Sequence, residues 1–281
     1  MKTGIREYYL NRYGLDEGTA RMVEDGYSYV DLSFANTETE YYTEKDEGFL
    51  LMLSKKRREL KERGIEVYQI HGPWRCPRDA TEEDRAERFE KMTKSLVIAK
   101  YLGARYVALH PLMPYGLDSP EDPDGVYEIN HRFFSALANV ASKLGVTVCL
   151  ENMPFPEFPL SSPLRVLGLI RDINSPALKM CLDVGHANIV GGRISEDIHE
   201  IGDQLRILHL HDNYGEEDTH NPLFDGTVNW AEVAEALYEI GFDGVASLEC
   251  SPVGDSEQMT DEERREREKR IAGYAKLIAG V

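Results

Sequence analysis

Six residues of types that bind metal ions recur along the chain at intervals of 26 to 41 residues. Each stands at the end of a short apolar run that is typical of a β-strand: His71, His110, Glu151, Asp183, His209 and Glu249. In a protein whose strands and helices alternate along the chain, one strand and one helix together take roughly 31 residues. The strands of such a protein run parallel, so their carboxyl ends meet on one side. The spacing therefore predicts that these side chains converge at one site.

The chemistry of that site follows from its carboxylates. Glu151, Asp183 and Glu249 would repel one another where the dielectric constant is low, and a divalent cation removes that cost. Imidazole and carboxylate donors together suit manganese, cobalt, iron or zinc, and carboxylate-rich sites also accept magnesium. Any one of these side chains alone is more typical of a hydrogen-bonded structural residue. The joint pattern favours a metal site made by Glu151, Asp183, His209 and Glu249.

Other polar residues stand just beyond the predicted strand ends. His186 and His220 follow two of the strands. His211 comes two residues after one of the ligand candidates, so a substrate contact and a bracing role both stay open. Trp74, in the loop after the first of these histidines, could stack on a sugar face or pack under that loop. Arg75 beside it either binds a substrate anion or braces the same loop.

The cysteines are predicted to be structural. Cys149 and Cys181 stand two residues before Glu151 and Asp183, so strand alternation turns all four side chains toward the same face. Two residues of strand rise are roughly 6–7 Å, which places both thiols one layer below the ligands. The four cysteines form no Cys-x-x-Cys pair, and a chain of this length is not expected to need a disulfide framework.

The elements that must position these residues alternate along the whole chain. Strands are predicted over residues 2–7, 27–34, 65–71, 106–110, 147–151, 178–183, 207–210 and 245–249. Helices are predicted over residues 16–24, 46–63, 82–102, 127–144, 163–172, 195–203, 230–240 and 261–278. This alternation predicts a single (β/α)8 TIM barrel over residues 1–281 as one domain. A doubly wound open sheet is the alternative, but its Gly-rich phosphate loop does not follow the first predicted strand.

Composition limits the partners of the protein. Acidic residues outnumber basic ones by 50 to 32, which gives a formal net charge of −18 and disfavours nucleic acid and anionic lipid. The hydrophobic fraction of 42% supports a sizeable core. The sequence contains no apolar stretch of membrane-spanning length and begins without a signal-peptide core. These features predict a cytoplasmic protein without a membrane partner, and a homo-oligomer stays open.

The segments around the predicted ligands resemble those of the xylose isomerase-like barrel superfamily. That superfamily contains sugar isomerases and epimerases of carbohydrate metabolism, inositol-catabolism enzymes and the endonuclease IV family of abasic-site nucleases. The resemblance runs from HGPW at 71–74 to SLEC at 247–250. Its most specific parts are LENMP at 150–154, CLDVGHA at 181–187 and LHLHDNYGEEDTHNPLFDGTVNW at 208–230. Their order and spacing match together.

The resemblance implies a divalent ion held by Glu151, Asp183, His209 and Glu249. In the sugar isomerases and epimerases of the family, the two glutamates flank the substrate. One removes a proton alpha to the carbonyl and the other returns it through an enediolate, while His186 would contact substrate oxygens. The resemblance thus predicts a metal-dependent isomerase or epimerase acting on a sugar or polyol ketone. Glu151 and Glu249 are the expected catalytic residues, and manganese, cobalt, magnesium or zinc is the expected cofactor.

The nuclease branch of the superfamily is the main alternative. It binds three zinc ions, and its additional ligands match His71, His110, His186, Asp218 and His220. More than one ion and zinc-dependent phosphodiester hydrolysis therefore stay open. Two features count against a nuclease: the residues after Glu151 are Asn-Met-Pro-Phe-Pro rather than a Thr-Ala-Gly-Gln-Gly-like loop, and the chain is strongly acidic. An inosose dehydratase-type lyase is a further alternative.

Overall fold

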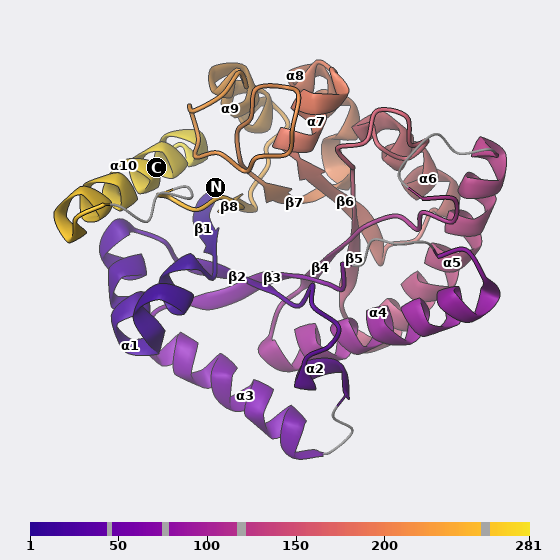
Figure 1. Ribbon diagram of the computed structural model, residues 1–281, viewed down its shortest axis with the longest axis horizontal. Helices are drawn as coiled ribbons and strands as arrows, with labels where there is room; N and C mark the ends of the chain where they lie inside the picture. Colours follow the sequence, from indigo (N-terminus) through magenta and orange to yellow (C-terminus); the bar gives the residue numbers. More distant parts are fainter. Residues whose placement is uncertain (44–46, 75–78, 117–121, 254–258) are drawn as a thin grey trace.

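Eight parallel strands stand inside a ring of helices (Figure 1). The computed structural model describes residues 1–43, 47–74, 79–116, 122–253 and 259–281. Its strands are β1 (Lys2–Arg6), β2 (Tyr29–Ser33), β3 (Glu66–His71), β4 (Tyr106–Leu109), β5 (Thr147–Glu151), β6 (Leu178–Asp183), β7 (Leu205–His209) and β8 (Val245–Leu248). All eight were predicted, with bounds that differ by at most a few residues.

The strands pair in the order β7-β6-β5-β4-β3-β2-β1-β8, so each strand lies beside its sequence neighbour and β1 joins β8. The circle closes between β7 and β8 through a single bridge of Leu210 with Leu248. There Leu210 donates its N–H to the Ser247 carbonyl at 2.9 Å, and Glu249 donates to the Leu210 carbonyl at 3.0 Å. The structure is therefore a nearly closed (β/α)8 barrel, which confirms the predicted fold class.

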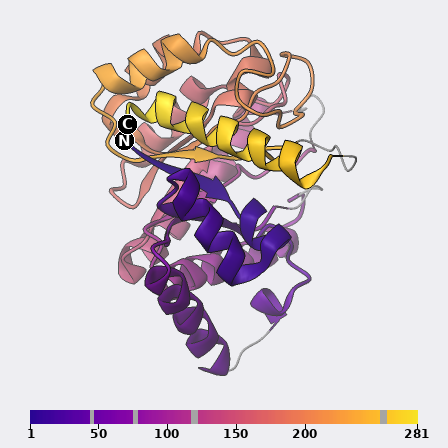
Figure 2. The same ribbon diagram turned by 90° about the vertical axis from the view of Figure 1, so that its left-hand side faces the viewer.

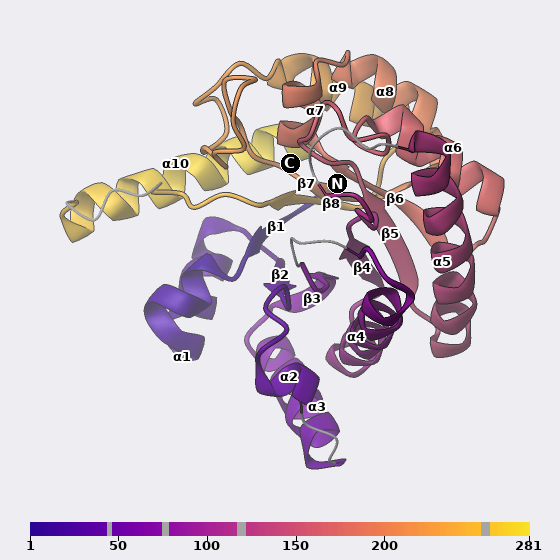
Figure 3. The same cartoon turned by 45° about the vertical axis from the view of Figure 1, so that its right-hand side comes forward.

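Helices surround the strands on all sides (Figures 1 and 3). They are α1 (Tyr8–Asp25), α2 (Glu40–Thr43), α3 (Glu47–Glu62), α4 (Glu82–Leu102), α5 (Pro123–Leu144), α6 (Pro163–Ile173), α7 (Val184–Val190), α8 (Ile194–Ile201), the 3-10 turn η1 (Gly202–Gln204), α9 (Trp230–Glu239) and α10 (Asp261–Ala279). Within the described ranges, none of these helices combines the length and apolarity that crossing a bilayer requires.

Local sequence explains where several helices begin and end. Asp84 donates its N–H to the Thr81 hydroxyl while the Thr81 N–H is accepted by the Asp84 carboxylate, and this capping box starts α4. The helix ends at Gly103, whose φ of 81° is in the left-handed region that glycine adopts without strain. Helix α1 consists of two helical segments that meet in a kink at Gly14, whose φ of 76° and ψ of −176° are not helical. The helix predicted over residues 16–24 lies in the second segment.

The two ends of the chain are held together on one side of the barrel (Figure 2). Helix α10 packs against α1, where the buried Glu268 carboxylate accepts hydrogen bonds from Tyr8 at 3.0 Å and Tyr13 at 2.6 Å. Arg265 of the same helix lies 2.6 Å from Asp25 at the end of α1. This polar contact joins the first and last helices and includes none of the residues that end the strands.

Candidate metal centre

The four residues predicted as metal ligands meet at the mouth of the barrel. Glu151, Asp183 and His209 end β5, β6 and β7, and Glu249 immediately follows β8. Their ligand atoms all lie within 4.8 Å of one another, and all four side chains are buried. His209 Nδ1 lies 2.7 Å from Glu151 Oε1 and 2.7 Å from Glu249 Oε2. Three carboxylates and one imidazole thus surround a single point.

The pKa values of Glu151 and His209 indicate that these buried ligands need a positive charge between them. Burial alone would raise the pKa of Glu151, but His209 and His110 hold it well below its usual range. The pKa of His209 behaves in the opposite way: burial lowers it, and the acidic groups Cys181, Glu151 and Glu249 raise it well above its usual range. The carboxylates therefore favour a positive charge at this point. A divalent cation fits this set because it supplies that positive charge.

A second group of possible ligands lies beside the first. Asp218 Oδ2 is 3.2 Å from His186 Nε2 and 3.3 Å from His220 Nε2. His211 Nε2 lies between the two groups, 3.0 Å from Asp183 Oδ1 and 3.6 Å from Asp218 Oδ1. The ligand atoms of His186, His211, Asp218 and His220 again lie within 4.8 Å of one another.

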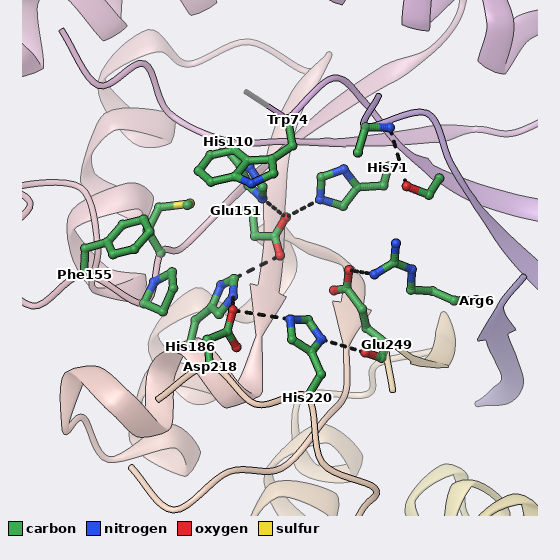
Figure 4. A pocket seen from close by; sticks show the side chains of 14 residues that line it. Arg6, His71, Trp74, His110, Glu151, Phe155, His186, Asp218, His220 and Glu249 are labelled. Atoms are coloured by element: carbon green, nitrogen blue, oxygen red, sulfur yellow. Dashed lines mark hydrogen bonds and ion pairs between the residues drawn. The ribbon is translucent and has the colours of Figure 1, made fainter. Parts of the chain in front are cut away.

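A third group shares Glu151 with the first. His110 Nε2 lies 3.1 Å and His71 Nε2 lies 3.6 Å from Glu151 Oε2. The indole of Trp74 packs edge-on against the His110 ring, with centroids 4.3 Å apart (Figure 4). The structure therefore brings together all five residues that the sequence offered for additional ions or substrate.

Residues of all three groups line a pocket that is open to solvent and has a cavity volume of about 170 Å³: His71, His110, Glu151, His186, Asp218, His220 and Glu249. Glu151 and Glu249 face the pocket from different sides, and Phe155 from the loop after β5 forms part of its wall (Figure 4). Arg6, from the end of β1, donates from Nη1 to Glu249 Oε1 at 2.8 Å.

The three weaker substrate-binding predictions have different outcomes. Trp74 lines the pocket, and its stacking on a substrate stays a prediction. His211 is fully buried, and its ring faces Asp183 and Asp218, which fits a bracing or ligand role better than contact with a substrate. Arg75 lies outside the described residues.

Three residues of the site were not singled out from the sequence. Arg6 lines the pocket, and Asp31 and Gln69 lie buried beside His209. The signal for the latter two was present: each is a polar residue within an apolar predicted strand. Arg6 fell within the first predicted strand, residues 2–7, where no pattern distinguished it from a surface residue.

Cys181 is closer to the ligands than the sequence predicts. Its sulfur lies within 4.8 Å of ligand atoms of both Glu151 and His209, whereas a full layer of separation was expected. The reason is the stagger of the strands: β5 and β6 pair with Glu151 opposite Cys181, so the two residues are level in the barrel. Cys149 lies in the interior as predicted, in a small buried cluster with Cys181.

The backbone at Gly185 makes room for His211. A Cβ at this position would lie 2.0 Å from His211 Cε1, so we expect Gly185→Ala to displace the ring from Asp183 and Asp218. Overpacking of this kind typically costs about 1–3 kcal/mol of stability. Thermal unfolding and the number of Co²⁺ ions bound per chain measure the effect. Gly168→Ala in α6 is the matched control, because its added Cβ meets no described atom within 4 Å. Equal behaviour of the two variants would contradict the expected packing role.

The sequence of the chain is similar to those of known TIM-barrel proteins. A model of the xylose isomerase-like TIM barrel family matches residues 20–270. The uncharacterized protein MJ1311 of Methanocaldococcus jannaschii is 30% identical over 261 residues, which cover 91% of this chain and 86% of that protein. The D-psicose 3-epimerase of Agrobacterium fabrum is 27% identical over 199 residues, covering 69% and 67% of the two chains.

Solved structures share the fold over nearly the full length. A D-psicose 3-epimerase crystallised in the presence of D-fructose superposes with a TM-score of 0.80 at 19% identity, covering 100% of both chains. The protein IOLI with a bound zinc atom superposes with a TM-score of 0.77 at 20% identity, covering 98% of both. Sugar epimerases thus stand among both the sequence relatives and the structural neighbours. The chain belongs to the xylose isomerase-like TIM barrel family.

Proposed function

We propose that the protein, as one domain over residues 1–281, is a divalent-metal-dependent epimerase or isomerase of a sugar or polyol ketone. The observation that carries this proposal is that ligand atoms of Glu151, Asp183, His209 and Glu249 lie within 4.8 Å of one another, while Glu151 and Glu249 also line an open pocket. These four residues would hold the ion. When bound, it supplies a Lewis acid that lowers the barrier to removing a proton from the carbon beside a carbonyl.

Glu151 and Glu249 are placed for the two proton transfers. Both carboxylates line the pocket at separate positions (Figure 4), and each has an oxygen 2.7 Å from His209 Nδ1. A substrate lying between them presents opposite faces, so one glutamate removes the proton alpha to the carbonyl and the other returns it to the enediolate. Proton transfer by positioned side chains of this kind typically contributes about 10²–10⁴-fold to a rate.

The other pocket residues suit an uncharged polyhydroxy substrate. Arg6 is the only lysine or arginine among the described residues that line the pocket, and Glu249 already neutralises it. His186 and His220 bring ring nitrogens that can bind hydroxyl groups, and Trp74 brings an aromatic edge. An unphosphorylated ketose fits this lining better than a sugar phosphate does. The D-psicose 3-epimerase relative supports the same substrate class.

A panel of ketoses and cyclic polyol ketones in deuterated water tests the proposal. We expect at least one of them to be converted to its epimer or isomer when Mn²⁺, Co²⁺, Mg²⁺ or Zn²⁺ is present. Proton NMR would report deuterium at the carbon alpha to the carbonyl. Lack of turnover across the panel with every ion would contradict an epimerase or isomerase of these substrates.

Metal-dependent phosphodiester hydrolysis is the second candidate. Its support is the pair of additional ligand groups, one around Asp218 and one around His71 and His110, which flank the first group. Adjacent ions stabilise both the attacking and the leaving oxygen in a phosphoryl displacement. A chain that binds two or three ions therefore has the ligands that this reaction needs.

A duplex carrying one abasic site distinguishes the two candidates. We expect neither tight binding nor efficient cleavage, even at low salt, because a net charge of −18 disfavours contact with a phosphate backbone. Gel-shift and nicking assays with zinc-loaded protein measure both, and a dedicated abasic-site nuclease is the positive control. Cleavage at a rate comparable to that of the control would favour the hydrolase instead.

A further inference from the structure

A buried carboxylate lies behind His209, on the side away from the pocket. Asp31, in β2, is 2% exposed, and its Oδ2 lies 3.3 Å from His209 Nε2. The other ring nitrogen, Nδ1, faces Glu151 and Glu249. The imidazole therefore stands between a carboxylate on one side and the proposed ion position on the other.

Gln69 holds this carboxylate in place. Its side-chain amide, from β3, donates to Asp31 Oδ2 at 2.9 Å and to the Leu208 carbonyl of β7 at 3.4 Å. Gln69 is 1% exposed, so the whole arrangement lies inside the barrel. The amide thereby ties Asp31 to the strand that carries His209.

We propose that Asp31 and Gln69 are a positioning pair for His209, a role that rests on the metal site of the proposed function. Because Nδ1 faces Glu151 and Glu249, it is the nitrogen that would bind the ion; the ring proton would then stand on Nε2, and a buried N–H needs an acceptor. Among the described residues His209 Nε2 is buried without a hydrogen bond, and Asp31 Oδ2, 3.3 Å away, is the acceptor that we assign to its proton. In that role Asp31 would fix the tautomer and keep the ring turned toward Glu151 and Glu249. Carboxylates that support a ligating histidine in this way typically contribute about 10–100-fold to metal affinity.

A purely structural role for Asp31 makes a different prediction. A buried polar residue that only completes the packing of β2 and β3 would affect the stability of the fold and leave metal affinity unchanged. A measurement of metal affinity therefore distinguishes the positioning role from the structural role. It does not depend on an assay of turnover.

The experiment is a competition titration of Co²⁺ and Zn²⁺ against a chromophoric chelator at fixed pH. We expect Asp31→Ala to bind each ion about 10–100-fold more weakly than the unaltered chain. Asp31→Asn retains the size and one acceptor oxygen and should lose less. Gln69→Leu keeps the volume but frees the carboxylate, so it should also weaken binding. The visible spectrum of the Co²⁺ form should change in all three, because the imidazole is no longer held in one orientation.

Asp25→Asn is the matched control. Asp25 is also buried, and it is bound by Tyr9 and Arg265 in the contact between α1 and α10. Its loss should lower the unfolding temperature without changing the affinity for Co²⁺ or its spectrum. Asp31 and Gln69 variants that fold and retain unaltered affinity and spectrum would overturn the positioning role. Should the unaltered chain bind neither ion, the proposed metal site itself is wrong and this inference is wrong with it.

Discussion

Removal of divalent ions is expected to abolish turnover of the substrate, and their return is expected to restore it. Without an ion, His209 Nδ1 lies 2.7 Å from a carboxylate oxygen of each glutamate, so it faces them rather than a substrate carbonyl and cannot replace the Lewis acid. Dialysis against a chelator followed by addition of Mn²⁺, Co²⁺, Mg²⁺ or Zn²⁺ measures the effect on activity. Elemental analysis of protein purified without chelators should show at least one ion per chain.

Acid should weaken ion binding, because the pKa of His209 is raised well above its usual range and its proton must leave before the ion binds. Affinity for the ion should accordingly rise as the pH rises. Protein that contains no ion, and gains no activity from any of the four, would contradict the metal-dependent mechanism.

Glu151→Gln and Glu249→Gln are expected to reduce kcat by about 10²–10⁴-fold at saturating ion. Glutamine keeps the size of the side chain and one oxygen donor, but it cannot accept a proton. Metal affinity should fall as well, so each variant is assayed over a range of ion concentrations until the rate no longer rises. Glu268→Gln is the matched control, because Glu268 is equally buried but lies in the contact between α1 and α10. It should lower stability and leave kcat unchanged.

Exchange of the alpha proton with deuterated solvent distinguishes proton transfer from a hydride shift. Substrate recovered from the unaltered protein in deuterated water should carry deuterium alpha to the carbonyl, and the glutamine variants should slow this exchange in parallel with kcat. Turnover without any incorporation of deuterium would instead indicate a hydride shift. The proton-transfer roles of Glu151 and Glu249 would then be wrong.

The sequence was sufficient to predict the strands and what stands at their ends. Apolar runs of strand length recur with the period of one barrel unit, and β5 and β6 end at Glu151 and Asp183 as the pattern indicated. Parallel pairing then determines that these ends share one mouth. The convergence of the candidate ligands needed no knowledge of the loops.

What the sequence could not predict depends on contacts between strands. Asp31 lies 3.3 Å from His209, and Gln69 bonds Asp31 and the Leu208 carbonyl, across the interior of the barrel; no spacing along the chain reports these distances. Helix α7 was missed because Asp183 is both a strand end and a helix cap: its carboxylate accepts the N–H of His186 at 2.7 Å. The role of Asp183 as the cap of α7 becomes visible only in the structure.

The barrel is least firmly joined between β7 and β8, where one bridge at Leu210 and Leu248 takes the place of a ladder. His209 ends one side of this seam and Glu249 follows the other, with their polar atoms 2.7 Å apart. An ion shared by these two residues would cross-link the seam. A ligand that binds only the folded state stabilises that state by mass action. Loss of the ion would therefore weaken the contact between β7 and β8 and lower the stability of the closed barrel. Metal-free protein, which cannot catalyse the reaction, would then also unfold and be degraded more readily than metal-bound protein.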